Sequence, residues 1–224
     1  MRDHWQLILI TLLVAALWNT SIVLPLKILV VFLHELSHGL AAVVTGGSIE
    51  GLTVTADEGG QALTRGGNRF LILSAGYLGS LLFGVLFFLA ALRTEADRAV
   101  VAGLSIAILG VSIVYLRDTF ALGFALGTGV ALLAIAKWLG DVVNDLVLRI
   151  IGLTSMIYVP LDIFSDTLAR AHLHSDARML AEIYGATTMF WGLVWLCLSL
   201  VVIWFCLRNV LGSDSNITLD RLIR

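Results

Sequence analysis

The sequence predicts an all-α polytopic membrane protein with six or seven transmembrane helices and a short β-hairpin between the second and third spans. Composition gives the first reason, because 59% of the 224 residues are hydrophobic and only 13% are charged, whereas soluble domains have roughly 25% charged residues. The second reason is that uncharged apolar stretches of about 20 residues, the length that crosses the hydrocarbon core, recur along the chain. Such a chain is too apolar for a soluble or a disordered protein.

Charge and cysteine content exclude two further classes of protein. The chain has 14 basic and 16 acidic residues, a formal charge of −2, and no basic block that would follow a phosphate backbone. Its two cysteines, Cys197 and Cys206, lie on nearly opposite sides of one predicted helix and cannot pair. We therefore expect a lipid bilayer around the chain, no nucleic-acid partner and no disulfide framework.

The predicted spans follow one another with short polar connections. The first, Gln6 to Leu26, carries no charge and continues into further apolar sequence without a clear cleavage site, so we interpret it as a span and not as a signal peptide. Pro25 and Pro160 are expected where the backbone changes course. The other predicted spans are Lys27 to Thr45, Phe70 to Leu92, Ala99 to Leu116, Thr119 to Ala136, Leu146 to Phe164 and Ile183 to Leu207.

Two segments interrupt this pattern. Residues 46–69 are rich in Gly and Thr, alternate roughly from Ile49 to Thr55, and contain the turn sequence Asp57-Glu58-Gly59-Gly60, which predicts a membrane-associated β-hairpin. Residues 165–182 form a polar connection. The chain is thus one transmembrane domain over residues 1–208 with a polar tail at 209–224, and Gly76, Ser80 and Gly84 form a stripe that lets a neighbouring helix approach closely.

The second predicted span carries the residues that point to chemistry. His34-Glu35-Leu36-Ser37-His38 is an H-E-x-x-H sequence, so two imidazoles lie one helical turn apart and can bind one zinc ion, with Glu35 placed beside the water that the metal activates. Unpaired, such groups would each cost several kcal/mol at membrane depth. A zinc ion offsets that cost and favours metal-assisted amide hydrolysis with Glu35 as general base.

A catalytic zinc usually has three protein ligands, so a further side chain must complete the site. Asp162 is the leading candidate because it ends the apolar run from Ile150 to Leu161 with no basic residue close in sequence; Asp166, one turn further on, is the alternative. Asn144 is a candidate for stabilising the transition state by polarising the scissile carbonyl. His172 and His174 are weaker candidates for approaching the metal.

These residues resemble the site-2 protease clan of intramembrane zinc metallopeptidases, in particular its small peptidase-like branch without a PDZ domain. The resemblance rests on His34 to Gly39, on Ala75-Gly76-Tyr77-Leu78-Gly79-Ser80, and on Val159-Pro160-Leu161-Asp162, which is similar to a late P-x-x-D-G or L-D-G segment. It implies that Asp162 is the third zinc ligand. Ile163, however, replaces the glycine that follows this aspartate in the larger family, so Asp166 remains the alternative ligand. Ser175-Asp176-Ala177 and Trp191-Gly192 also resemble the small branch.

The resulting hypothesis is an intramembrane zinc metalloendopeptidase with one zinc ion per chain, acting on a membrane protein or peptide in or near a transmembrane segment. By the resemblance we expect it in the bacterial inner membrane. The hairpin at 46–69 is expected to gate the site and to pair with an unwound substrate strand. The alternative is a non-proteolytic zinc-binding membrane protein, either an inactive protease-like scaffold or a chaperone. Retention of Glu35 argues against it, because a structural site has no use for the base.

Overall fold

The computed structural model describes residues 4–169, 175–210 and 215–217. Within these ranges six helices are long and apolar enough to cross a membrane, which confirms the all-α polytopic fold at the lower of the two predicted counts. The elements, in chain order, are α1 (Trp5–Ala16), α2 (Leu24–Val44), β1 (Ser48–Val54), β2 (Gly60–Arg65), α3 (Arg69–Arg93), α4 (Asp97–Tyr115), α5 (Thr119–Trp138), α6 (Asp141–Phe164), the π-helical turn η2 (Ser165–Ala169), α7 (Asp176–Tyr184) and α8 (Thr188–Val210).

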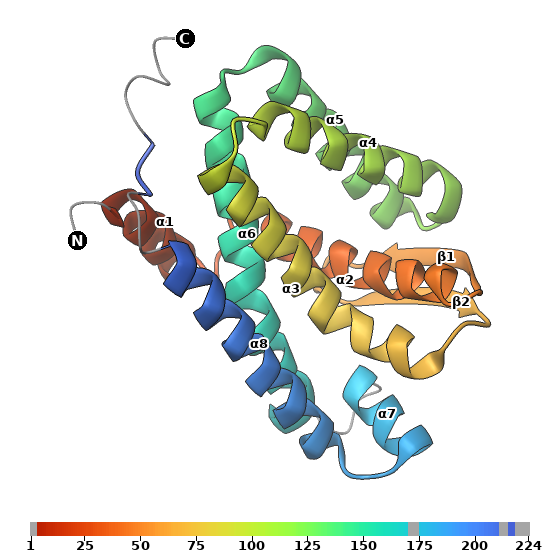
Figure 1. The fold of residues 1–224 in the computed structure, drawn as a ribbon. Helices are drawn as coiled ribbons and strands as arrows, with labels where there is room; N and C mark the ends of the chain where they lie inside the picture. The colour runs from red at the N-terminus through yellow and green to blue at the C-terminus, as the bar shows by residue number, and fades with distance from the viewer. Residues whose placement is uncertain (1–3, 170–174, 211–214, 218–224) are drawn as a thin grey trace.

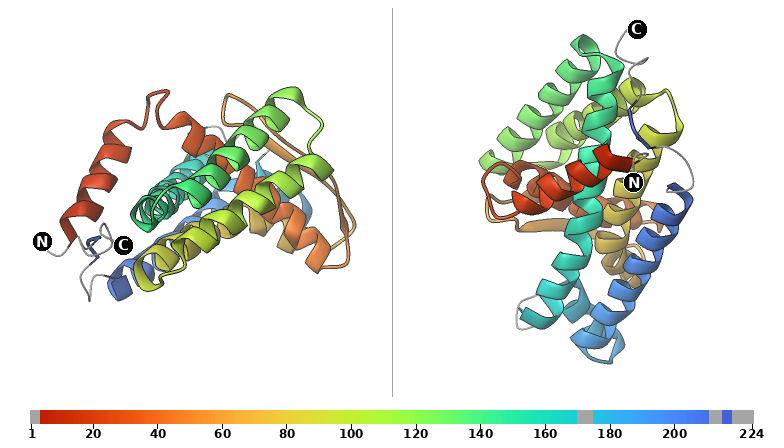
Figure 2. Two further views of the ribbon diagram at one scale, coloured as in Figure 1. Left: turned by 90° about the horizontal axis from the view of Figure 1, so that it is seen from above. Right: turned by 90° about the vertical axis from the view of Figure 1, so that its left-hand side faces the viewer.

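Helix α3 is the centre of the bundle, because it packs on both α2 and α6 (Figure 1). The hairpin lies along α2, and the short helix α7 lies between α3 and α8. Figure 2 shows α4 and α5 side by side, and the chain then continues into α6. The fold therefore brings the motif helix α2 into contact with the hairpin on one side and with α3 on another.

Close packing of α3 on α6 confirms the predicted stripe of small residues. A Cβ on Gly84 would lie 2.5 Å from the Cβ of Ser155, and a Cβ on Gly152 would lie 2.7 Å from the carbonyl oxygen of Gly84. The hydroxyl of Ser155 donates a hydrogen bond to the carbonyl of Ser80 at 2.8 Å. Only small side chains allow the two helix backbones to approach so closely.

The first predicted span, Gln6 to Leu26, is wrong. Helix α1 covers 12 residues and ends at Ala16, too short to cross a bilayer by itself. Polar side chains compete with the helical hydrogen bonds there, as when the hydroxyl of Thr20 donates to the carbonyl of Leu17 at 2.6 Å. Pro25 is the second residue of α2, where its missing N–H costs nothing.

The end of α6 also differs from the prediction. The helix continues through Pro160 without a break and passes directly into the π-helical turn η2. The predicted polar connection at 165–182 contains η2 and the helix α7, which begins after Ser175, whose side chain accepts a hydrogen bond from the backbone N–H of Arg178. α7 does not reach span length, so it adds a short amphipathic helix and not a seventh span.

The predicted hairpin is confirmed as an antiparallel pair, β1 and β2. Its turn is closed by the backbone N–H of Thr55, which donates to the carbonyl of Gly59 at 2.8 Å. Two contacts hold the hairpin in place. Leu52 forms a parallel bridge with Leu116 at the end of α4, and Glu58 in the turn forms an ion pair of 2.6 Å with Lys27 of α2. The hairpin is thus held at β1 and at its tip.

Candidate metal centre

The two histidines of the motif project from one face of α2, as their spacing predicts. The ring centroids of His34 and His38 are 4.8 Å apart. The Nδ1–H of His38 donates a hydrogen bond of 2.7 Å to the backbone carbonyl of Ile72 on α3. A carbonyl at Nδ1 fixes the ring and leaves Nε2 as the atom that faces the site.

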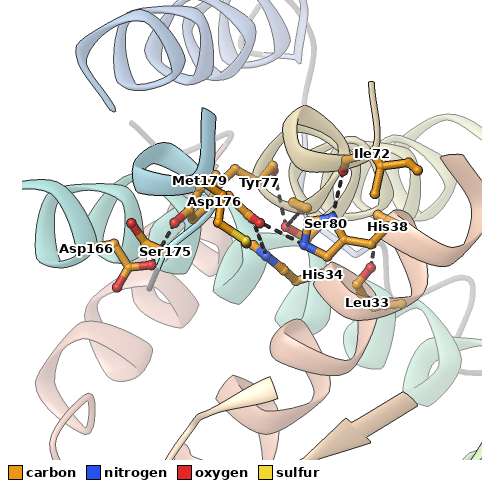
Figure 3. A network of polar contacts seen from close by, with 12 residues as sticks. Leu33, His34, His38, Ile72, Tyr77, Ser80, Asp166, Ser175, Asp176 and Met179 are labelled. Carbon is orange, nitrogen blue, oxygen red and sulfur yellow. Dashed lines mark hydrogen bonds and ion pairs between the residues drawn. The ribbon is translucent and has the colours of Figure 1, made fainter. Parts of the chain in front are cut away.

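A carboxylate from α7 lies against both imidazoles. One oxygen of Asp176, Oδ2, is 3.0 Å from Nε2 of His34 and 3.2 Å from Nε2 of His38 (Figure 3). Asp176 is only 7% exposed at its side chain. The structure thus gathers two nitrogen donors from α2 and one oxygen donor from α7 at one buried point.

The charge of Asp176 is favoured by this position. Burial raises the pKa of its carboxyl group, but the charge of His38 and the hydrogen bonds from both imidazoles outweigh burial and hold the pKa well below its usual range. Asp176 is therefore ionised at neutral pH, the state in which a carboxylate ligates a metal.

The spacing of the three donor atoms fits a zinc ion. Ligand atoms about 2.1 Å from a tetrahedral zinc lie about 3.4 Å from one another. The observed separations of 3.0 and 3.2 Å from the carboxylate oxygen to the two nitrogens are within a few tenths of an ångström of that value. Two imidazoles and one carboxylate are also a donor set that catalytic zinc uses.

Glu35 lies beside these donors and against the hairpin. A donor atom of Glu35 and those of the two histidines all lie within 4.8 Å of one another. The backbone N–H of Ala62 on β2 donates a hydrogen bond to its carboxylate. A Cβ on Gly60 would lie 2.5 Å from Oε1 of Glu35, so β2 passes directly over this carboxylate, and a side chain at Gly60 would displace it.

Two glycines of α3 bring that helix onto the motif. A Cβ on Gly76 would lie 2.3 Å from Nε2 of His34 and 2.6 Å from Cε1 of His38. A Cβ on Gly79 would lie 2.4 Å from the hydroxyl of Ser37. The backbone of α3 thus forms one wall of the site, and any side chain at Gly76 would displace the imidazoles.

The donors open into a cavity of about 810 Å³. Its walls come from α2, both strands of the hairpin, the start of α3, the end of α6 with η2, and α7. Residues Gly60 to Thr64 of β2 line it in an unbroken run. A cavity of this size accommodates an extended peptide segment next to Glu35.

The two carboxylates that the sequence favoured lie in the same cavity. Asp162 and Asp166 both line it, and Oδ2 of Asp166 accepts a hydrogen bond of 2.6 Å from the hydroxyl of Tyr77. Their role as third ligand stays a prediction. Asp176 is the stronger candidate, because its oxygen already contacts both imidazoles. Sequence reasoning missed Asp176 as a ligand. The signal that could have found it is the resemblance of Ser175-Asp176-Ala177 to the small branch of the clan.

Asn144 does not lie where the predicted transition-state role requires. Its side chain is fully buried at the start of α6, where its Nδ2 donates to the carbonyls of Leu139 and Gly140. From there to Asp162 the helix makes about five turns, or about 27 Å. Asn144 thus stabilises the beginning of its own helix. His172 and His174 lie outside the described residues.

A family model described as Peptidase M50B-like matches residues 7–206. The chain belongs to this family. The match runs from within α1 to within α8 and includes the motif of α2 and Asp176 of α7. Family and helices together make the protein an integral membrane protein of a metallopeptidase family. Searches of curated proteins and of solved structures return no match.

The close contact of Gly76 with both imidazoles gives a direct test of this geometry. We expect Gly76→Ala to weaken zinc affinity by about 10–100-fold, the range seen when the positioning of a metal ligand is disturbed. Gly110→Ala on α4 is the matched control, because a Cβ there meets nothing within 4 Å. Zinc titration of the two purified variants measures the difference, and equal affinities would contradict the described packing of α3 on α2.

Proposed function

We propose that the protein is an intramembrane zinc metalloendopeptidase that hydrolyses a peptide bond in or near a transmembrane segment. The observation that carries this proposal is the convergence of His34 Nε2, His38 Nε2 and Asp176 Oδ2 beside Glu35 in one cavity. One zinc ion per chain, held by the two histidines and Asp176, would polarise water and the scissile carbonyl.

Glu35 is the general base of this proposal. Its carboxylate takes a proton from the attacking water as the water oxygen bonds to the carbonyl carbon, and it then delivers the proton to the amide nitrogen as the C–N bond breaks. The hydrogen bond from the backbone of Ala62 orients the carboxylate for both transfers. A structural metal site needs no such base, which favours hydrolysis over a purely structural role.

The hairpin supports a way to bind an unwound substrate. β1 is bridged to Leu116, whereas β2 lines the cavity and its Ala62 N–H faces Glu35 instead of β1. An extended peptide can therefore add to the cavity edge of β2, with its backbone held beside the base. We propose a membrane protein or peptide as the substrate and the bacterial inner membrane as the location.

Metal content tests the ligand set. We expect about one zinc per chain in the wild type, lost in His34→Ala, His38→Ala and Asp176→Ala and kept in Glu35→Gln, by elemental analysis of purified protein. Asp162→Ala and Asp166→Ala are the matched controls, since both residues line the cavity. If Asp162→Ala loses zinc and Asp176→Ala keeps it, the third ligand is Asp162, as predicted from the sequence. A wild type that contains no zinc would overturn the proposal.

Proteolysis tests the reaction itself. Fluorescently labelled casein in detergent micelles is an unfolded chain with accessible peptide bonds, and we expect the wild type to cleave it. Glu35→Gln should lower kcat by about 100-fold or more while zinc is retained, because only the base is removed. A zinc chelator should abolish cleavage and added zinc restore it. A zinc-loaded Glu35→Gln variant with wild-type kcat would mean that Glu35 is not the base.

Strand addition to β2 has its own test. Thr64 lies two residues after Ala62, so its N–H points to the same side of the strand. Thr64→Pro removes that donor without removing a bond to β1, and an edge position tolerates proline. We expect KM for casein to rise about tenfold with zinc content unchanged, as for loss of one backbone hydrogen bond. Thr64→Ala is the control, and an unchanged KM in the proline variant would contradict strand addition.

A further inference from the structure

Peptide hydrolysis is faster when a hydrogen-bond donor faces the carbonyl oxygen of the scissile bond. That oxygen becomes negatively charged as the bond is attacked, and a preorganised hydrogen-bond donor is among the largest contributions to catalysis. Asn144, the candidate from sequence, lies at the opposite end of α6 from the residues that line the cavity. A donor nearer to the metal-binding residues would add to the polarisation that zinc supplies.

Tyr77 is placed beside the metal-binding residues. It follows Gly76 on α3, and its ring lies edge-on against His34, with centroids 4.9 Å apart and planes at 84°. It is 1% exposed and yet lines the cavity. Its hydroxyl donates a hydrogen bond of 2.6 Å to Oδ2 of Asp166, so the proton already points to a charged group within the cavity (Figure 3).

The described cavity wall carries other side-chain donors as well. The guanidinium of Arg69 contacts the sulfur of Met179 at 3.5 Å, and the oxygen of Ser175 accepts the hydrogen bond that caps α7. The remaining donors lie on the hairpin, with Thr53 at the end of β1, Thr55 just after it, and Gln61 and Thr64 on β2. Tyr77 differs from all of these in its ring contact with His34, which holds it beside the metal-binding residues.

We propose that Tyr77 is a catalytic residue whose hydroxyl stabilises the oxyanion of the tetrahedral intermediate. This inference rests on the proposed peptidase function. As the water oxygen bonds to the carbonyl carbon, the π electrons of the C=O bond move to the carbonyl oxygen, and the hydroxyl of Tyr77 donates its hydrogen bond to that oxygen without losing the proton. When the C=O bond reforms and the C–N bond breaks, the charge leaves the oxygen and the hydroxyl returns to Asp166.

Packing makes the hydroxyl a preorganised donor. The ring of Tyr77 is held between His34 and Trp195 of α8, whose ring centroid is 5.2 Å away. Asp166 holds the hydroxyl at the cavity wall, and the π-helical turn η2 holds Asp166. These contacts hold the ring in place, so the hydroxyl is positioned before a substrate binds.

The test is Tyr77→Phe, which keeps the ring and removes only the hydroxyl. We expect kcat for casein cleavage to fall by about 100-fold, with KM and zinc content near those of the wild type. A second readout needs no turnover. N-phosphoryl-leucinamide carries tetrahedral, anionic phosphoryl oxygens like those of the intermediate, and its Kd should rise about tenfold or more in the variant, as for loss of a hydrogen bond to a charged group.

Two control variants separate the possible roles. Tyr158→Phe makes the same change in the neighbouring cavity and should leave kcat and Kd unchanged. Asp166→Ala removes the partner of the hydroxyl and should lower kcat less than Tyr77→Phe does. If it lowers kcat equally, or if Tyr77→Phe keeps wild-type kcat, the inference is overturned. A wild type that binds no zinc and cleaves nothing contradicts the proposed function, a result distinct from these.

Discussion

The structure depends on concentrating ionisable groups at one buried point within an apolar bundle. Between the apolar helices, one oxygen of Asp176 lies 3.0 and 3.2 Å from the two imidazoles, and a carboxylate oxygen of Glu35 lies within 4.8 Å of both. Each group alone would be costly there, so each must be paired. Asp176 pairs with both imidazoles, and the backbone of β2 donates to Glu35. Helix α7 and the hairpin are therefore placed by electrostatics as much as by apolar packing.

Small residues make that concentration possible. Gly76 and Gly79 let α3 contact the motif helix, and Gly60 lets β2 cross Glu35. Farther along the bundle, Gly84 of α3 and Gly152 of α6 bring these two helices equally close, and the far end of α6 with η2 carries Asp162 and Asp166 to the cavity. Small residues let membrane helices pack closely without a strong hydrophobic driving force. In this protein they also shape the walls of a polar site.

Local patterns predicted most of the fold. The H-E-x-x-H spacing, the Gly-rich turn of the hairpin and the apolar stretches each depend on residues close in sequence, and the structure contains the corresponding helix face, hairpin and spans. The break after α1 was missed because composition alone cannot distinguish one long apolar helix from two shorter ones joined at Asn19 to Ser21. Asn144 was expected near the site because the sequence does not show which end of the sixth span faces the metal-binding residues. The structure places them at the other end of this helix.

The third donor shows where sequence reasoning ends. Asp162 was favoured because it ends an apolar run, which is a property of the chain and not of its three-dimensional neighbours. Asp176 lies 138 residues after His38 on a short helix in a polar segment, and only the packing of α7 on α3 brings it to the imidazoles. No periodicity connects the two positions.

X-ray absorption at the zinc edge would show whether the two histidines and Asp176 bind one metal ion, because it reports the ligands and their distances. In the zinc-loaded wild type we expect two imidazole nitrogens at about 2.0 Å and oxygen ligands at about 2.0–2.2 Å, with no sulfur. Asp176→Asn should change the oxygen shell, and Asp162→Asn should leave the spectrum as it is. A spectrum unaffected by Asp176→Asn, or one with a single imidazole, would contradict the convergence of His34, His38 and Asp176 on one metal ion.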